Sequence, residues 1–378
     1  MANHAKAAEN TWATVAEMPT EREEFGVAVV DRKIYAIGGY NYRNAVLSVN
    51  EVYDPATNTW TVKKPMPTPR AGFGIAVYQN KIYVIGGRDY NHQPLGVNEV
   101  YDPATDTWEK RKDMPTPRKG LTANVVNGKI YLIGGLESVD GYPPKISSLN
   151  EVYDPVADSW IVGKPLQVRV CGHASAVVDN KIYVIGGESL EKTNQVCVVN
   201  VTQIYDPKTD TWSLGTPCPV AVRYAAAGGT TGVMAPKKIY VIGGIPGLSS
   251  ESTGINQVYD PERDFWTLGT SMPTSRLWLS VAVVNDMLYA LGGTWMILNP
   301  QSPIYAVNER YIPFGYGTTT PTDTTPPQEP PQSEPFPTTW AVAAAGSVAV
   351  VGASIVFYFK RFRKNQRRKP MNSVADFL

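Results

Sequence analysis

Short runs of consecutive apolar residues recur along the chain, and each run ends in a pair of glycines. The runs read KIYAIGG, KIYVIGG, KIYLIGG or MLYALGG and end at Gly39, Gly87, Gly135, Gly187, Gly244 and Gly293. Consecutive apolar positions rich in β-branched and aromatic residues predict a strand that is covered on both faces. The glycine pairs are 48, 48, 52, 57 and 49 residues apart, so the chain repeats one unit with a regular period.

Each unit contains four strand signals with turn signals between them. In the second unit the first two strands are FGIAVY and IYVI, separated by QNK, and the third is NEVY. Asp102-Pro103 then predicts a turn, because Asp bonds its own backbone and Pro fixes φ, and the fourth strand surrounds Trp108. Helical periodicity is absent before residue 340, so the repeated part is predicted to be all-β.

The two ends of the repeated region complement one another. Thr11-Trp12 and EMPTER repeat the end of a unit without the three strands that normally come first. The last unit runs through MLYALGG and VNERY but lacks a Trp-containing fourth strand. A ring in which residues 11–15 complete the last unit explains both facts and leaves no open edge. We predict a six-bladed β-propeller that is closed by the N-terminal strand, within residues 1–316.

These motifs resemble the kelch repeat family. The resemblance rests on the Gly-Gly pairs, on the Tyr and Trp of the YDP…W segments and on the Arg after MPTP, and it spans all six units. It implies a kelch β-propeller. Function is not implied to the same degree, because one fold hosts both binding proteins and enzymes.

Residues that recur in every unit are expected to be scaffold. We expect the recurring Trp side chains to pack between adjacent blades. Arginines recur at the start of each first strand, and a carboxylate or amide recurs in each third strand. The arginines are Arg22, Arg70, Arg118, Arg169, Arg223 and Arg276, and their partners would be Glu51, Glu99, Glu151, Gln203, Gln257 and Glu309. Two interpretations stay open: structural Arg–Glu/Gln contacts, or a basic ring that holds a ligand.

The connections between the second and third strands differ in every unit, and variable loops on a rigid scaffold are where binding residues concentrate. These loops and the starts of the first strands carry aromatic, arginine and histidine side chains of the kind that dominate interfaces. The candidate ligand-binding residues are Tyr40, Tyr42, Arg43, Arg88, Tyr90, His92, Tyr142, Tyr224, Trp278 and Trp295. We expect them to bind a protein or a glycan.

A carbohydrate-active enzyme, similar to a sialic acid mutarotase or another sugar-modifying protein, is the alternative. Glu137, Asp140, Glu188 and Glu191 lie on the candidate face, but their spacing does not pair two of them for acid–base chemistry. With three His and three Cys in the chain, no metal site, cofactor or catalytic residue is predicted. The cysteines are expected to be small buried side chains, with a single bridge as the alternative.

The C-terminal part has a different composition. Residues 317–339 are rich in Pro and Thr, which predicts an extended stalk or linker. Residues 340–359 contain no charge and are long enough to cross a bilayer as a helix. Residues 360–378 include the basic run KRFRKNQRRK, which belongs on the cytoplasmic side by the positive-inside rule.

This order of segments resembles C-terminally anchored, single-pass surface proteins, so we expect the propeller outside the cytoplasm. The N-terminal residues show no apolar signal-peptide core, which keeps a cytosolic, tail-anchored propeller as the alternative. The 35 basic and 34 acidic residues nearly cancel, so nucleic acid is not an expected partner.

Overall fold

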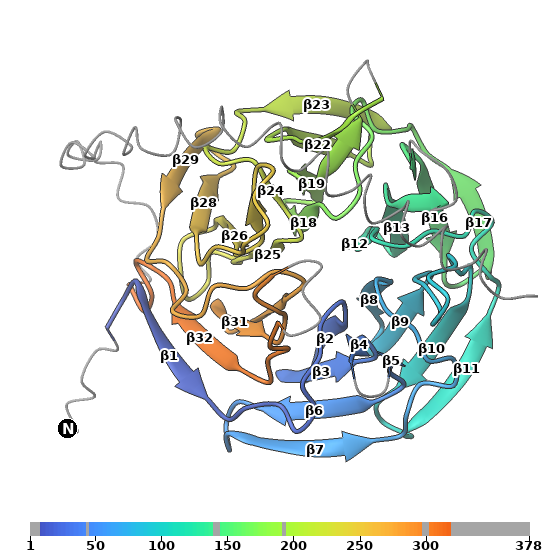
Figure 1. Ribbon diagram of the computed structural model, residues 1–378, viewed down its shortest axis with the longest axis horizontal. Helices are drawn as coiled ribbons and strands as arrows, with labels where there is room; N and C mark the ends of the chain where they lie inside the picture. Colours follow the sequence, from blue (N-terminus) through green and yellow to red (C-terminus); the bar gives the residue numbers. More distant parts are fainter. Residues whose placement is uncertain (1–7, 43–44, 139–143, 191–193, 297–301, 319–378) are drawn as a thin grey trace, which may run out of the picture. The chain divides into compact units, whose positions relative to one another are not determined.

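The computed structural model describes residues 8–42, 45–138, 144–190, 194–296 and 302–318. These residues form six four-stranded antiparallel sheets arranged as the blades of a ring (Figure 1). The innermost strands β2, β8, β12, β18, β25 and β30 pack against one another around the ring. The prediction of an all-β, six-bladed propeller is therefore confirmed.

The blades follow one another along the chain, each running from the innermost to the outermost strand. Blades I to III comprise β2 (Gly26–Val30), β3 (Lys33–Ile37), β6 (Asn50–Asp54) and β7 (Thr59–Lys63), then β8 (Gly74–Tyr78), β9 (Lys81–Ile85), β10 (Asn98–Asp102) and β11 (Thr107–Arg111), then β12 (Thr122–Val126), β13 (Lys129–Ile133), β16 (Asn150–Asp154) and β17 (Ser159–Val162). Blades IV to VI comprise β18 (Ala174–Val178), β19 (Lys181–Ile185), β22 (Thr202–Asp206) and β23 (Thr211–Gly215), then β25 (Ala226–Gly229), β26 (Ile239–Ile242), β28 (Asn256–Asp260) and β29 (Phe265–Leu268), then β30 (Ser280–Val284), β31 (Met287–Leu291), β32 (Asn308–Ile312) and β1 (Thr11–Val15).

Blade VI combines the two ends of the repeated region. Strand β1 pairs antiparallel with β32 over five residues, from Thr11 opposite Ile312 to Val15 opposite Asn308 (Figure 1). The N-terminal strand thus supplies the fourth strand that the last repeat lacks. Closure of the ring by residues 11–15, as predicted, is confirmed.

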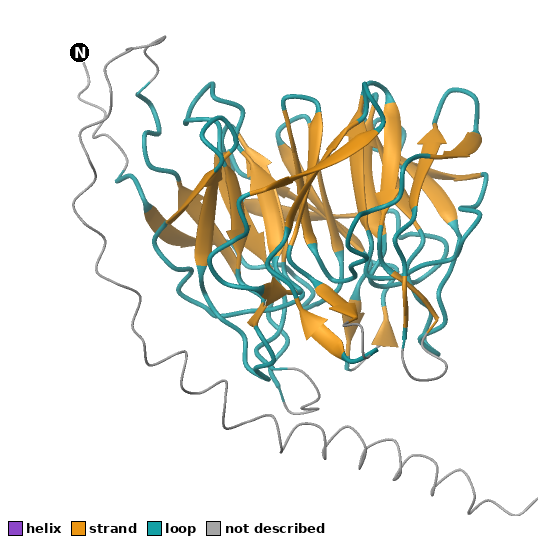
Figure 2. Cartoon of the chain, turned by 90° about the horizontal axis from the view of Figure 1, so that it is seen from above, coloured by secondary structure: helices purple, strands orange, loops and turns teal. Residues whose placement is uncertain are grey.

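The loops between second and third strands and the connections that enter each innermost strand lie on one face of the disc, and they contain short extra strands. Below the sheets in Figure 2, small two-stranded pairs are visible beside the loops. They are β4 (Tyr40–Asn41) with β5 (Ala45–Val46), β14 (Leu136–Ser138) with β15 (Lys145–Ile146), β20 (Glu188–Leu190) with β21 (Val196–Val198), and β24 (Val222–Arg223) with β27 (Ile245–Pro246). We call this side of the propeller the loop face.

The YDP…W segments join neighbouring blades. In blade II the Tyr101 hydroxyl donates to Asp106 Oδ1, which also accepts the backbone N–H of Lys64 at the end of blade I. The Trp108 indole donates to the Lys64 carbonyl, 2.9 Å away. Equivalent indole bonds recur in the other five blades, and Trp12 makes the last one to Thr270. The Trp side chains therefore join adjacent blades as expected, while the Tyr side chains are the more deeply buried of the two.

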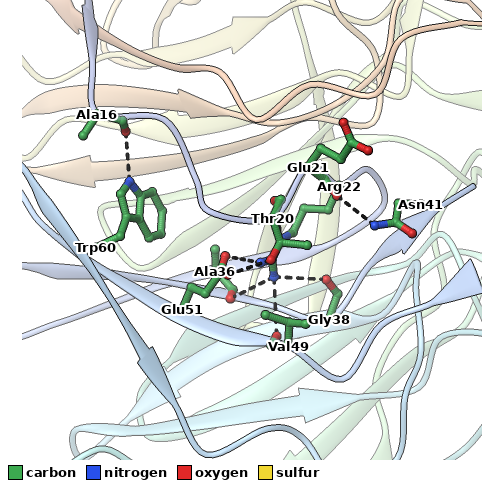
Figure 3. A network of polar contacts seen from close by, with 10 residues as sticks. All are labelled: Ala16, Thr20, Glu21, Arg22, Ala36, Gly38, Asn41, Val49, Glu51 and Trp60. Carbon is green, nitrogen blue, oxygen red and sulfur yellow. Dashed lines mark hydrogen bonds and ion pairs between the residues drawn. The ribbon is translucent and has the colours of Figure 1, made fainter. Parts of the chain in front are cut away.

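Four blades contain a buried ion pair. In blade I the Arg22 guanidinium pairs with Glu51 and also donates to the carbonyls of Ala36, Gly38 and Val49 (Figure 3). Burial lowers the pKa of Arg22 to about 10, although the Glu51 carboxylate opposes that effect. The same pairing occurs between the residues Arg70 and Glu99, Arg118 and Glu151, and Arg276 and Glu309. These arginines are fully buried, so the interpretation as structural contacts is confirmed for them.

The prediction that Arg169 and Arg223 contact the third-strand residues Gln203 and Gln257 was wrong. In blades IV and V the place of the buried arginine is taken by a buried valine, Val170 and Val222, directly beside these arginines in the chain. The third-strand amide compensates: Gln203 bonds both the N–H and the carbonyl of Val168, and Gln257 bonds Val220 in the same way. An ion pair is thus replaced as a unit by a valine and a glutamine. The repeat pattern hid this replacement because an arginine stands next to the valine in both blades.

The described residues contain no helix that is long and apolar enough to cross a membrane. The predicted stalk, membrane segment and basic tail lie, apart from residues 317 and 318, outside the described residues. No disulfide joins the three cysteines, all of which the structure describes, so the alternative of a bridge is wrong. Cys171 and Cys218 are buried, as expected, whereas Cys197 is partly exposed.

The substitution of an ion pair by Val and Gln in blades IV and V gives a test. Arg70→Val alone should lower the free energy of unfolding by about 3–5 kcal/mol, because it leaves the Glu99 carboxylate buried without its charged partner. Arg70→Val combined with Glu99→Gln should recover most of that loss, because the introduced amide can then bond the backbone of Thr68. Urea unfolding measures both, and Arg111→Val is the control, since its partly exposed pair with Glu109 is worth less than about 1 kcal/mol. A double variant no more stable than Arg70→Val would contradict this account.

Candidate functional site

A closed ring of six backbone hydrogen bonds surrounds the channel at the loop face. Each blade contributes the residue two positions before the start of its innermost strand. The N–H of that residue donates to the carbonyl of the equivalent residue in the preceding blade, over 2.7–3.1 Å. All six residues have positive φ, from 51° to 63°. They are Glu24, Gly72, Gly120, Gly172, Tyr224 and Trp278, and we call them the central amide ring.

Three blades place a glycine in the ring, where positive φ is unstrained. The other three place Glu24, Tyr224 and Trp278 in the same left-handed conformation. Such a conformation is an outlier for bulky residues, costs of order 1–3 kcal/mol each, and is concentrated at functional sites. The ring therefore holds these three side chains at the mouth of the channel although residues of these types prefer negative φ.

A cavity of about 280 Å³ opens at this mouth. The Tyr224 ring lies over Gly172, where an added Cβ would come within 2.5 Å of it. Trp278 packs against Tyr224 with ring centroids 5.1 Å apart. The aromatic pair therefore forms one wall, on blades V and VI, and covers Gly172, while Gly72 and Gly120 of blades II and III leave the floor open. Lys119, Cys171 and Glu188 also line the cavity.

Both carboxylates at the mouth are paired with arginines. Glu24 accepts a 2.8 Å bond from Arg88 Nε, and Glu188 pairs with Arg223. Burial acts to raise the pKa of Glu24, but the Arg88 guanidinium outweighs it, so the net pKa is lowered. Glu24 is therefore ionised at neutral pH and is no general acid.

Among the described residues that line the mouth, Lys119 is the cation outside any ion pair; burial lowers its pKa, and the Glu24 carboxylate opposes that effect. Burial raises the pKa of the Cys171 thiol and lowers the pKa of the His173 imidazole to about 3, so both are neutral. The half-buried Lys119 ammonium makes no hydrogen bond or ion pair within the described part of the chain. The mouth thus presents one positive charge beside an aromatic wall.

The exposed candidates lie on neighbouring blades. Tyr42 of blade I is 45% exposed, Tyr90 of blade II 66% and Trp295 of blade VI 39%, and all three lie in loops of the loop face. Because blades VI, I and II are consecutive around the ring, these side chains form an arc, which we call the aromatic arc. Trp295 is anchored through its carbonyl, which accepts the N–H of Ser252 from blade V.

The candidates Arg88, Tyr40, His92, Arg43 and Tyr142 are not part of the aromatic arc. Arg88 is 4% exposed and its guanidinium lies over the Tyr40 ring, 5.1 Å from the ring centroid, so it supports Tyr40. Tyr40 in turn packs edge-on against Tyr42. His92 is exposed in the β9–β10 loop, and Arg43 and Tyr142 lie outside the described residues.

The sequence interpretation missed Glu24 and Lys119. A signal existed for Glu24, because it occupies the position of Gly72 and Gly120, the same comparison that pointed to Tyr224 and Trp278. No pattern distinguished Lys119 from other surface lysines, since only the ring brings it beside the aromatic pair.

The alternative of a carbohydrate-active enzyme is not favoured. Of its four candidate carboxylates, Glu137 pairs with Lys145 and Glu188 with Arg223, while Asp140 and Glu191 lie outside the described residues. The described members of this set thus offer no pair of carboxyl groups that is free for acid–base catalysis.

The family model that matches this chain describes an Attractin/LZTR1 beta-propeller and covers residues 34–235, more than half of the chain. The chain belongs to this β-propeller family. Within it, the central amide ring and the buried Arg–Glu pairs are the scaffold on which the loop face is built.

Curated relatives of this β-propeller carry the kelch name. Kelch-like protein terF of Aspergillus terreus is 36% identical over 126 residues, which is 32% of this chain and 26% of the relative. Kelch repeat and BTB domain-containing protein 12 of Homo sapiens is 31% identical over 163 residues, or 39% and 25%. The chain thus spans about a quarter of the length of these relatives. A resemblance to kelch propellers is confirmed.

A solved structure, titled Structure of YjhT, is similar in fold. It superposes with a TM-score of 0.64 at 16% identity, over 78% of this chain and 95% of that chain. At this identity the similarity shows the propeller fold alone.

The buried carboxyl group of Glu23, next to the mouth, predicts that the free energy of unfolding depends on pH. Burial, followed by the nearby Glu24 charge, raises its pKa from 4.5 to about 8, and its Oε2 is buried without a hydrogen bond. The folded state therefore holds a proton that the unfolded state loses above pH 4.5. The stability this gives is full below pH 4.5 and is lost as the pH rises to 8.

Glu23→Gln, which is neutral at every pH, should remove that loss. Relative to the unsubstituted protein, its free energy of unfolding should rise by up to about 1.4 kcal/mol per pH unit between pH 4.5 and 8. Chemical unfolding at several pH values in this window measures the difference. A difference that does not change with pH would show that Glu23 is ionised in the folded protein.

Proposed function

We propose that this propeller is a binding module that recognises a protein partner through its loop face, with the aromatic arc as the contact surface. The observation that supports this proposal is the exposure of Tyr42, Tyr90 and Trp295 on three consecutive blades. Large aromatic side chains bury much area with few rotatable bonds and dominate interface energetics. Kelch propellers act in general as protein-binding modules, which supports the same function.

The arc is also held in place before binding. Tyr42 rests on Tyr40, Tyr40 lies under Arg88, and Arg88 is fixed by its ion pair with Glu24 of the central amide ring. A surface that is already ordered loses less entropy on association. The loop face therefore supports a pre-organised protein-binding site rather than a catalytic one.

The triple substitution of Tyr42, Tyr90 and Trp295 by Ala should weaken partner binding more than about tenfold, because it removes the proposed anchors. The melting temperature should change by only a few degrees, since these side chains are exposed. Surface-protein and glycan arrays probed with the unsubstituted chain identify the ligand, and interferometry then compares the variants. Substitution of the exposed outer-strand residues Val62, Ile161 and Phe265 by Ala is the matched control. Unchanged affinity of the triple variant, or hits on glycans alone, would contradict the proposal.

We also propose that residues 340–359 anchor the chain in a membrane, with residues 317–339 as a stalk and residues 360–378 as a cytoplasmic tail. The support is the uncharged length of 340–359 and the basic run that follows it. This arrangement would present the loop face outside the cytoplasm.

Protease treatment of intact cells tests this topology. Cleavage within the stalk should release a fragment that contains the propeller, because closed blades resist digestion better than a Pro/Thr-rich segment. Immunoblotting of the supernatant with an antibody against the propeller measures the release. Full protection until the cells are lysed would instead establish a cytosolic propeller.

A further inference from the structure

The mouth of the channel differs from the aromatic arc in position and in chemistry. It is lined by Lys119, Cys171, Glu188, Tyr224 and Trp278, none of which belongs to the arc. Three features of these residues need an explanation that protein binding by the arc does not give. They are the strained aromatic pair, the floor left open at Gly72 and Gly120, and a lysine that is in no ion pair with the described residues.

The backbone strain at Tyr224 and Trp278 indicates that these two side chains have a role beyond closing the central amide ring. Blades II to IV show that glycine closes the central amide ring without strain, so the ring itself needs no aromatic side chain. Two adjacent aromatic residues in left-handed backbone are not required by the repeat. They line a cavity of about 280 Å³ whose floor includes Gly72 and Gly120, which leaves room for a flat apolar group beside them.

The described ionised groups at the mouth and their arginine partners sum to a single positive charge. Glu24 is paired with Arg88 and Glu188 with Arg223, which leaves the Lys119 ammonium. Partial burial makes the charged form of Lys119 less favourable, and an anionic ligand would offset that cost. Because only one charge is left to compensate, a monoanion suits the site better than a doubly charged phosphate.

We propose that the channel mouth binds a carboxylate carried on an apolar or aromatic group, with the carboxylate on Lys119 and the apolar part against Tyr224 and Trp278. The same chemistry has two sources, a free small organic acid or an acidic side chain beside an aromatic one in a partner polypeptide. Binding at this site does not depend on the aromatic arc.

The full-length chain is titrated calorimetrically with phenylacetate and with phenylacetamide, its uncharged counterpart. Phenylacetate should bind about tenfold more tightly, because a charge-assisted contact to the ammonium is lost in the amide. Lys119→Met should abolish this preference, whereas Lys119→Arg should keep it. Lys110→Met is the matched control, because Lys110 lies on the outermost strand of blade II and is exposed. Trp278→Ala should weaken both compounds.

Blocked dipeptides distinguish the two sources. If acetyl-Phe-Asp-amide binds more tightly than phenylacetate, and acetyl-Phe-Asn-amide does not, the carboxylate belongs to a polypeptide; the reverse order indicates a free acid. Equal affinity for phenylacetate and phenylacetamide, or a preference that persists in a folded Lys119→Met variant, would overturn the proposal. The triple variant of the aromatic arc should keep the preference for phenylacetate over phenylacetamide. The proposal for the channel mouth can therefore fail or hold independently of the proposed function of the arc.

Discussion

The central amide ring is the constraint on which the rest of the propeller depends. Each blade must place one residue in left-handed backbone so that its N–H reaches the carbonyl of the preceding blade, and the six bonds close only if every blade does so. This requirement fixes where each innermost strand starts and hence where each loop leaves the sheet. It explains why the position accepts glycine in three blades and holds Glu24, Tyr224 and Trp278 under strain in the others.

Outside that ring, the blades are joined by a second layer of repeated contacts. The bonds from a backbone N–H to the turn Asp and from the Trp indole to a carbonyl link neighbouring blades near the rim. In four blades a buried Arg–Glu pair fixes the entry of the blade to its third strand. In blades IV and V the ion pair is replaced as a unit by Val and Gln, because neither a buried arginine nor a buried carboxylate is tolerated alone. The residues at these two positions thus differ between blades, but in each blade the buried polar side chain on the third strand is hydrogen-bonded.

Function is concentrated where the blades stop repeating. Arg88 illustrates the connection between scaffold and site, since it pairs with Glu24 of the central amide ring and supports Tyr40, and through it Tyr42. The sequence comparison found Tyr224 and Trp278 because they replace glycines at a repeated position. It could not show that Arg88 is buried, and it passed over Lys119, because burial and ion pairing depend on residues from other blades.

The sequence alone determined the number of blades, their strand order and the closure by residues 11–15, since local patterns with a regular period carry that information. It also located the variable loops. Only the tertiary structure decided which arginines are buried, which aromatic side chains are exposed and which charges stay uncompensated. The physical reason is that strands and turns are encoded by neighbours in the chain, whereas burial and ion pairing at the mouth arise from residues that only ring closure brings together.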